Sequence, residues 1–148
     1  MYRNILIPTD GSVLAERGVT HGLALAKSVG AKVTAIIVEA PFSVYGVPES
    51  RLRQMTEAFT QYEQQVKAHA AKVMTHVGDL AKAAGVACDT VLLEHYHPYE
   101  AIIATAKDKG CDLIVMASHG RSGISAVLLG SVTSKVLAHT DIPVLVCR

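Results

Sequence analysis

The chain has 148 residues, of which 50% are hydrophobic and 18% are charged, and its formal net charge is +1. This length supports one domain with its own core, and this composition excludes a disordered chain. The near-neutral charge provides no electrostatic basis for binding nucleic acid or an anionic membrane. The three cysteines have no C-x-x-C spacing, which indicates reduced thiols in a cytoplasmic protein.

Neither a targeting segment nor a membrane span is expected. Only four residues, M-Y-R-N, precede the first apolar run, unlike the start of a signal peptide. No apolar run approaches the roughly 18 residues of a membrane span. We therefore expect a cytoplasmic protein with neither a membrane nor a nucleic acid as partner.

The first part of the chain has the pattern of a strand, a helix and a second strand. A strand is predicted over residues 3–7, where the apolar run Ile5-Leu6-Ile7 ends at Pro8. Apolar residues then recur at helical spacing over residues 13–29, with Asp10 or Ser12 placed to cap the start and Gly30 placed to end the helix. Residues 32–38 are almost continuously apolar, which favours a strand buried on both faces.

The middle of the chain predicts a loop and then a long helix. Residues 41–50 contain two prolines and a glycine and are expected to form the loop. From residue 51 to the helix end at Gly85, apolar residues recur in steps of three and four. A helix of this length spans about 50 Å, so its first turns are expected to break or to project beyond the sheet. We interpret the beginning of the stripe as core or dimer contact. Its members are Leu52, Met55, Phe59, Tyr62, Val66, Ala70, Val73, Val77, Leu80 and Ala84.

The last part of the chain continues the alternation of strands and helices. Pro98 suits the first position of a helix that Gly110 ends. Since the strands are apolar rather than alternating, the order predicts parallel pairing with helices on both faces. The expected fold is a single α/β domain over residues 1–148, Rossmann-like, with a doubly wound, open, five-stranded parallel sheet whose final strand lies at the edge. The expected strands here are residues 86–94, 112–116 and 144–147, and the expected helices are residues 100–109 and 131–139.

Two loops are rich in residues that bind ligands. One is Pro8-Thr9-Asp10-Gly11-Ser12 and the other spans residues 117–131. In open parallel sheets, ligands bind beyond the carboxyl ends of the strands, where the strand order reverses. If the first and fourth strands are neighbours at that point, both loops face one crevice, where Asp10 could bind a ribose or base and the glycines a phosphate. The chain has neither a P-loop nor a G-x-G-x-x-G motif, which disfavours a P-loop NTPase and a dinucleotide dehydrogenase.

Several segments resemble the universal stress protein family along nearly the whole chain. They are P-T-D-G-S, D-L-I-V-M-A-S-H-G-R-S-G, L-L-G-S-V-T and I-P-V-L-V. Nucleotide-binding members of that family carry the motif G-2x-G-9x-G-[ST], whose last three fixed positions match Gly120, Gly130 and Ser131. Ala117 stands where the motif has its first glycine. Alanine fits there if the main chain has ordinary dihedrals, so we expect binding to persist.

The resemblance implies a homodimeric regulatory protein of the stress response that binds ATP or AMP. Asp10 and the backbone of Val38 would recognise the adenosine, and Met116 and Ala117 would lie near the ribose. Arg121 is either a further phosphate ligand or a solvated loop cation. Mg²⁺ would bind through the phosphates, since no carboxylate cage is visible. The full predicted site is Pro8, Thr9, Asp10, Val38, Met116, Ala117, Gly120, Arg121, Gly130, Ser131 and Val132.

The strand over residues 144–147 is short, apolar and expected at an edge, where strands are commonly paired or covered. The resemblance implies that it pairs antiparallel with its symmetry mate to form the homodimer, with Cys147 near the contact. One alternative is a dimeric interaction module that binds no nucleotide, with Ala117 marking the loss. Another is a slow ATP-hydrolysing enzyme, although the S-G-G-x-D-S loop of ATP pyrophosphatases is replaced by T-D-G-S. A protein partner is expected, but the sequence does not identify it.

Two histidine-containing patterns are interpreted without catalysis or metal. Ser118 and His119 are adjacent, and adjacent loop residues rarely place a hydroxyl and an imidazole productively. His95-x-His97 lacks a third metal ligand, so we interpret these residues as a strand end and a helix cap.

Overall fold

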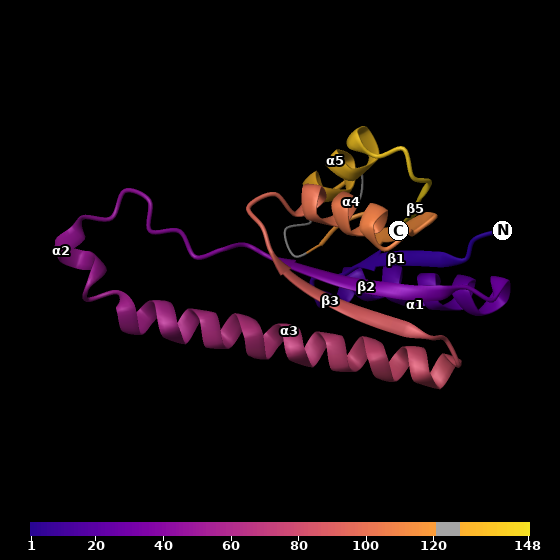
Figure 1. Ribbon diagram of the computed structural model, residues 1–148, viewed down its shortest axis with the longest axis horizontal. Helices are drawn as coiled ribbons and strands as arrows, with labels where there is room; N and C mark the ends of the chain where they lie inside the picture. Colours follow the sequence, from indigo (N-terminus) through magenta and orange to yellow (C-terminus); the bar gives the residue numbers. More distant parts are fainter. Residues whose placement is uncertain (121–127) are drawn as a thin grey trace.

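The computed structural model describes residues 1–120 and 128–148, and within them it forms one five-stranded sheet (Figure 1). The strand order is β3-β2-β1-β4-β5, and every adjacent pair is parallel. From β1 the chain adds β2 and β3 on one side and then β4 and β5 on the other, which confirms the doubly wound α/β fold. The strands are β1 (Asn4–Pro8), β2 (Lys32–Glu39), β3 (Cys88–Glu94), β4 (Leu113–Ala117) and β5 (Val144–Cys147).

Helices cover both faces of the sheet, and each face has its own apolar core. On one face, Val19 of the first helix and Val77 of the third pack with Ile5 and Ile7 of β1. On the other face, Leu6 of β1 packs with side chains of the last two helices. Successive side chains along β1 thus point to opposite faces of the sheet, as the two-residue period of a strand requires. The helices are α1 (Val13–Val29), α2 (Glu49–Leu52), α3 (Thr56–Ala84), α4 (Pro98–Asp108) and α5 (Ser131–His139).

Local signals account for the ends of α1 and for its close packing. Ser12 Oγ accepts a hydrogen bond from the backbone N–H of Ala15 at 3.1 Å, and Gly30 ends the helix at φ 70°, as predicted. Gly22 faces β1 so closely that a Cβ there would overlap the side chain of Ile7. A Cβ on Gly18 would lie 2.9 Å from the backbone nitrogen of Ala117. The glycines thus let α1 lie directly against β1 and the end of β4.

The predicted long helix is broken and projects from the sheet, as the sequence suggested. Residues 53–55 separate α2 from α3, and the first half of α3 extends well beyond the strands (Figure 1). Of α3, only Ala70, Val77 and Ala81 are buried. The sheet therefore holds only the second half of this helix.

The expectation of strands buried on both faces is wrong for β3. Whereas β1 and β4 are almost completely buried, most residues of β3 are exposed. The reason is topological, because β3 lies at an edge of the sheet and has a strand on one side only. The prediction of β5 at an edge is confirmed. No helix among the described residues is long and apolar enough to cross a bilayer.

Candidate functional site

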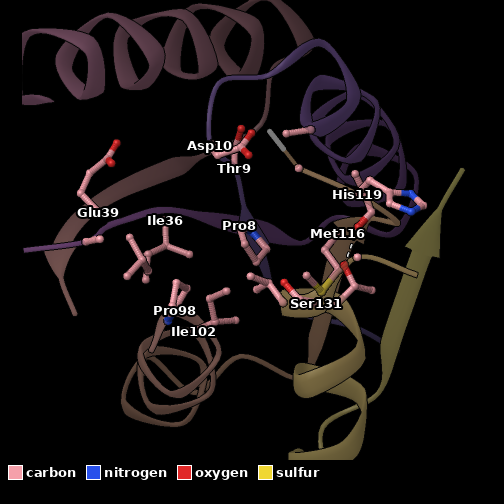
Figure 2. Close-up of a pocket in the computed structure, with 18 residues that line it drawn as sticks. Pro8, Thr9, Asp10, Ile36, Glu39, Pro98, Ile102, Met116, His119 and Ser131 are labelled. Carbon is pink, nitrogen blue, oxygen red and sulfur yellow. Dashed lines mark hydrogen bonds between the residues drawn. The ribbon is translucent and has the colours of Figure 1, made fainter. Parts of the chain in front are cut away.

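A cleft of about 300 Å³ opens at the carboxyl ends of the strands, where the strand order reverses around β1 (Figure 2). Because β1 pairs with both β2 and β4, the loops that follow β1 and β4 reach the same cleft. The prediction that both loops face one crevice required β1 and β4 to be neighbours, and they are. The residues that line the cleft are Pro8, Thr9, Asp10, Ala15, Ile36, Val38, Glu39, Ala40, Pro98, Ile102, Met116, Ala117, His119, Gly120, Gly130, Ser131, Val132 and Thr133.

Every predicted site residue in the described part of the chain lines this cleft. The remaining predicted residue, Arg121, lies outside the described residues. The structure thus brings together residues that are more than 100 positions apart in the sequence, such as Thr9 and Ser131.

The loop between β1 and α1 forms one wall of the cleft and is held by its own polar groups. Asp10 Oδ1 accepts a hydrogen bond from the backbone N–H of Ser12 at 2.9 Å. Thr9 Oγ1 accepts one from the N–H of Gly11 at 3.2 Å. A Cβ at Gly120 would overlap Oδ2 of Asp10 and lie 3.3 Å from its Cγ. Glycine at position 120 therefore leaves room for the Asp10 carboxylate.

The opposite wall joins the end of β4 to the start of α5. The N–H of Gly130 donates to Ser118 O at 2.7 Å, and Thr133 Oγ1 donates to Ala117 O at 2.9 Å. A Cβ at Gly130 would lie 3.0 Å from the same Ser118 oxygen. Gly130 is the N-cap of α5 and, being glycine, has no side chain with which to bind the first N–H groups of the helix. These N–H groups lie at the cleft, which Ser131 and Val132 line.

Ala117 departs from the glycine motif without backbone strain. Among the described residues, no non-glycine residue has a positive φ, and neither Gly120 nor Gly130 is among the glycines that do. The motif positions in this chain therefore need glycine for space rather than for a left-handed backbone. Alanine at position 117 is compatible with this backbone.

The apolar wall of the cleft was missed from the sequence. Ile36 of β2 lies opposite Pro98 and Ile102 of α4 (Figure 2). Glu39 also lines the cleft and is only 7% exposed, and its backbone oxygen accepts a hydrogen bond from the N–H of His95 at 3.0 Å. The available signal was positional, because the carboxyl end of β2 and the start of the helix after β3 reach the same edge of a parallel sheet.

The side chains of the adjacent residues Ser118 and His119 contact each other. Ser118 Oγ is 3.1 Å from His119 Nδ1, so the two side chains do form a hydrogen bond. However, His119 lines the cleft and Ser118 does not. A hydroxyl outside the cleft is badly placed to attack a ligand within it.

The His95-x-His97 pattern forms local contacts. His95 Nδ1 accepts a hydrogen bond from the N–H of His97 at 2.9 Å, and His97 is the N-cap residue of α4 without a side-chain capping bond. Among the described residues, no group of three or more histidine, cysteine or acidic side chains is placed to hold a metal ion. The interpretation as a strand end and a helix start is consistent with these contacts.

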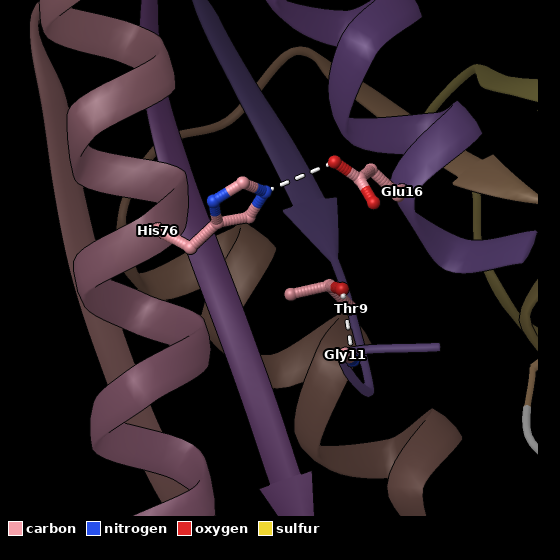
Figure 3. A network of polar contacts seen from close by, with 4 residues as sticks. All are labelled: Thr9, Gly11, Glu16 and His76. Atoms are coloured by element: carbon pink, nitrogen blue, oxygen red, sulfur yellow. Dashed lines mark hydrogen bonds and ion pairs between the residues drawn. The ribbon is translucent and has the colours of Figure 1, made fainter. Parts of the chain in front are cut away.

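A second, smaller cavity of about 230 Å³ lies between α1 and α3 and shares Thr9 with the cleft. At this cavity His76 Nε2 of α3 is 2.9 Å from Glu16 Oε1 of α1 (Figure 3). Gly11, at φ 77°, lies so close to α3 that a Cβ there would be 2.5 Å from Cγ2 of Val73. The loop that carries Asp10 is therefore supported from behind by α3.

The cysteines are poor candidates for chemistry. None of them lines the cleft. Burial raises the pKa of the Cys88, Cys111 and Cys147 thiols above the ordinary value. Since the thiolate is the reactive form, these side chains stay protonated and unreactive.

A family model described as the universal stress protein family matches residues 1–148. The chain belongs to the universal stress protein family. Among curated relatives, universal stress protein MJ0531 of Methanocaldococcus jannaschii is 32% identical over 148 residues, which cover 100% of this chain and 83% of the relative. This match agrees with the resemblance found in the sequence.

Solved structures of relatives have the same fold. Universal stress protein UspA from Lactobacillus plantarum is 28% identical with a TM-score of 0.85, over 99% of this chain and 98% of that one. The MJ0577 structure is 29% identical with a TM-score of 0.80, over 99% and 95%. Two more distant structures, which show the fold alone, contain nucleotides. One is a universal stress protein in complex with cAMP, at 24% identity and a TM-score of 0.71, over 99% and 97%. The other, from Archaeoglobus fulgidus, is in complex with dAMP, at 18% and 0.65, over 99% and 98%.

Proposed function

We propose that the cleft binds an adenine nucleotide, ATP or AMP, and that the protein is a regulatory module of the stress response in the cytoplasm. The observation that carries this proposal is the convergence of three segments on one cleft. They are the β1–α1 loop, the end of β2 and the start of α5, whose N-cap is a glycine. The volume of about 300 Å³ is within the range of small-molecule sites.

The chemistry of the cleft changes from one end to the other in the way that a nucleotide requires. Ile36, Pro98 and Ile102 form an apolar wall that suits the flat face of a base. The Asp10 carboxylate can accept hydrogen bonds from ribose hydroxyls or from the amino group of adenine. At the other end, the N–H groups and the dipole of α5 attract anions. A phosphate group is the natural occupant of that end, with Mg²⁺ bound through the phosphate oxygens.

The relatives solved with cAMP and dAMP support the choice of adenine. Both ligands combine an adenine base with a sugar and a phosphate, and both proteins have this fold. The likeness to them is distant, so the proposal depends on the residues of the cleft in this chain.

Isothermal titration calorimetry with ATP and with AMP tests the site. Gly130→Val is expected to abolish binding, because a Cβ at this position already presses on the backbone oxygen of Ser118 at 3.0 Å. Asp10→Ala is expected to weaken binding at the adenosine end. Glu16→Gln, in the second cavity, is the control and should bind as the wild type does. Unchanged ATP affinity in Gly130→Val would contradict the proposed site.

Native mass spectrometry of the freshly purified protein separates this proposal from the interaction module that binds no ligand. An adenine nucleotide that copurifies with the wild type and is missing from Gly130→Val supports binding. A wild type that carries no nucleotide and gives no heat with ATP or AMP favours the interaction module.

We also propose that β5 pairs with its symmetry mate to form a homodimer, which an unidentified protein partner then recognises. β5 is an edge strand, and its Leu145 is 42% exposed. Such an edge can pair with its own copy about a two-fold axis. Leu145→Asp should halve the mass measured by light scattering, whereas Leu92→Asp, at the opposite edge and 45% exposed, should not. An unchanged mass in Leu145→Asp would exclude this interface.

A further inference from the structure

The loop that carries Asp10 lies between the two cavities and forms part of the wall of each. Thr9 lines both cavities, Asp10 lines the cleft, and Gly11 lines the second cavity. On its far side the second cavity is lined by α3, from His69 to Val77. A residue of α3 can therefore act on the Asp10 loop from the side opposite to the cleft.

His69 of α3 contacts this loop at Asp10 itself. Its Nε2 lies 3.4 Å from the backbone oxygen of Asp10, and a ring nitrogen that carries a proton donates to such an oxygen. The same ring covers Gly11, because a Cβ at that position would lie 3.1 Å from Nε2 and 3.3 Å from Cε1 of His69. One imidazole therefore contacts the peptide group that joins Asp10 to Gly11.

The orientation of this peptide group sets the position of the Asp10 carboxylate. Gly11 has φ 77°, and because glycine adopts either sign of φ with ease, its own sterics do not fix the peptide. Asp10 Oδ1 accepts a hydrogen bond from the N–H of Ser12 at 2.9 Å. This turn, in which an aspartate binds the backbone two residues on, closes only while the intervening peptide keeps its orientation. A contact that holds the peptide therefore also holds the carboxylate.

The helix that carries His69 is anchored directly beside it. Ala70 and Val77 are buried, and Val73, which lies behind Gly11, packs against the core of this face of the sheet. His69 itself is exposed. Its replacement therefore removes the contact with the loop without creating a cavity in the core.

His76 provides a matched comparison on the same face of α3, two turns further along. Its Nε2 lies 2.9 Å from Glu16 Oε1 of α1 rather than from the Asp10 loop (Figure 3). Both side chains of this pair are exposed, and an exposed ion pair contributes little to stability.

We propose that His69 is a positioning residue for nucleotide binding, which holds the peptide between Asp10 and Gly11 from α3 and so keeps the Asp10 carboxylate in its binding position. This role rests on the proposed function. It adds to the nucleotide site a residue that does not line the cleft and acts only through Asp10.

His69→Ala and His69→Gln, titrated with ATP by calorimetry, separate positioning from a general effect on the fold. Alanine removes the contact, so the dissociation constant should rise roughly 2- to 12-fold, as expected for the loss of one hydrogen bond. Glutamine carries an amide N–H that can donate to the same oxygen and should restore most of the wild-type affinity. His76→Gln should bind as the wild type does. The midpoint of thermal unfolding should be the same in all three variants.

Amide hydrogen exchange, measured by NMR on the nucleotide-free protein, tests the position of the loop without a ligand. In His69→Ala the N–H of Ser12 should exchange faster than in the wild type, because its acceptor on Asp10 is held less firmly. His69→Gln and His76→Gln should exchange at nearly the wild-type rate.

These measurements distinguish a failure of this role from a failure of the proposed function. A wild type that binds neither ATP nor AMP would overturn both. A wild type that binds ATP, with equal affinity or equal Ser12 exchange in His69→Ala, would overturn the role of His69 alone. A loss of affinity that His69→Gln does not restore, or that His76→Gln reproduces, would also overturn it, because the effect would then come from the packing of α3 as a whole.

Discussion

Replacing Gly120 by alanine is expected to weaken nucleotide binding while leaving the fold intact. The added Cβ would overlap Oδ2 of Asp10 and lie 3.3 Å from its Cγ, whereas ordinary contact begins at 3.4 Å. Since the overlapped atom is the end of a side chain, the carboxylate can move away, by about 1 Å. That movement takes Oδ2 away from the position at which we propose that it accepts a hydrogen bond from the nucleotide, whereas Oδ1 can keep its 2.9 Å hydrogen bond with the N–H of Ser12.

The expected loss follows from the hydrogen bond that we propose between that carboxylate and the nucleotide. A hydrogen bond to a charged group contributes about 1.5–3 kcal/mol. The dissociation constant for ATP should therefore rise roughly 10- to 150-fold. The midpoint of thermal unfolding should change little, because no buried apolar contact is lost. Calorimetric titration with ATP, together with thermal unfolding of the same samples, measures both quantities.

Gly78→Ala is the matched control, since a Cβ there meets nothing within 4 Å. It should leave affinity unchanged and stabilise α3 by about 1 kcal/mol through helix propensity. If Gly120 acts through Asp10, Asp10→Ala/Gly120→Ala should bind no more weakly than Asp10→Ala alone. Wild-type affinity in Gly120→Ala, or full additivity in the double variant, would refute the reasoning.

Three further changes test the packing and electrostatics of the domain. Gly22→Ala has the same gain in helix propensity as Gly78→Ala but presses on Ile7, so its free energy of unfolding should be lower than that of Gly78→Ala by about 1–3 kcal/mol. Ala117→Gly should lower the free energy of unfolding relative to the wild type by about 0.5–1 kcal/mol and leave ATP affinity unchanged. A large gain in affinity would show that the alanine methyl obstructs the ligand. Burial raises the pKa of Asp112, but backbone N–H groups and the nearby Arg3 outweigh it, so the pKa lies below the ordinary value. Asp112→Asn should therefore have a lower free energy of unfolding in urea than the wild type at neutral pH. This difference should disappear as the pH falls through the lowered pKa of Asp112. A difference that does not depend on pH would contradict this cause.

Part of the site could be predicted from the sequence because its signals are local. The residues that follow β1 and β4 stand out by composition and by the spacing of Gly120, Gly130 and Ser131. The structure places them in one cleft. The apolar wall formed by Pro98 and Ile102 has no such local signature, because it depends on where α4 packs.

The ends of the helices were likewise determined by the sequence, since caps and periodicity are properties of neighbouring residues. Ser12 and Gly30 bound α1, and the period of the stripe placed α3. Only the tertiary structure decided the order of the strands. The position of β3 at an edge and the adjacency of β1 and β4 both follow from that order. Pairing between distant segments depends on the packing of the whole chain, and no short stretch of sequence carries that information.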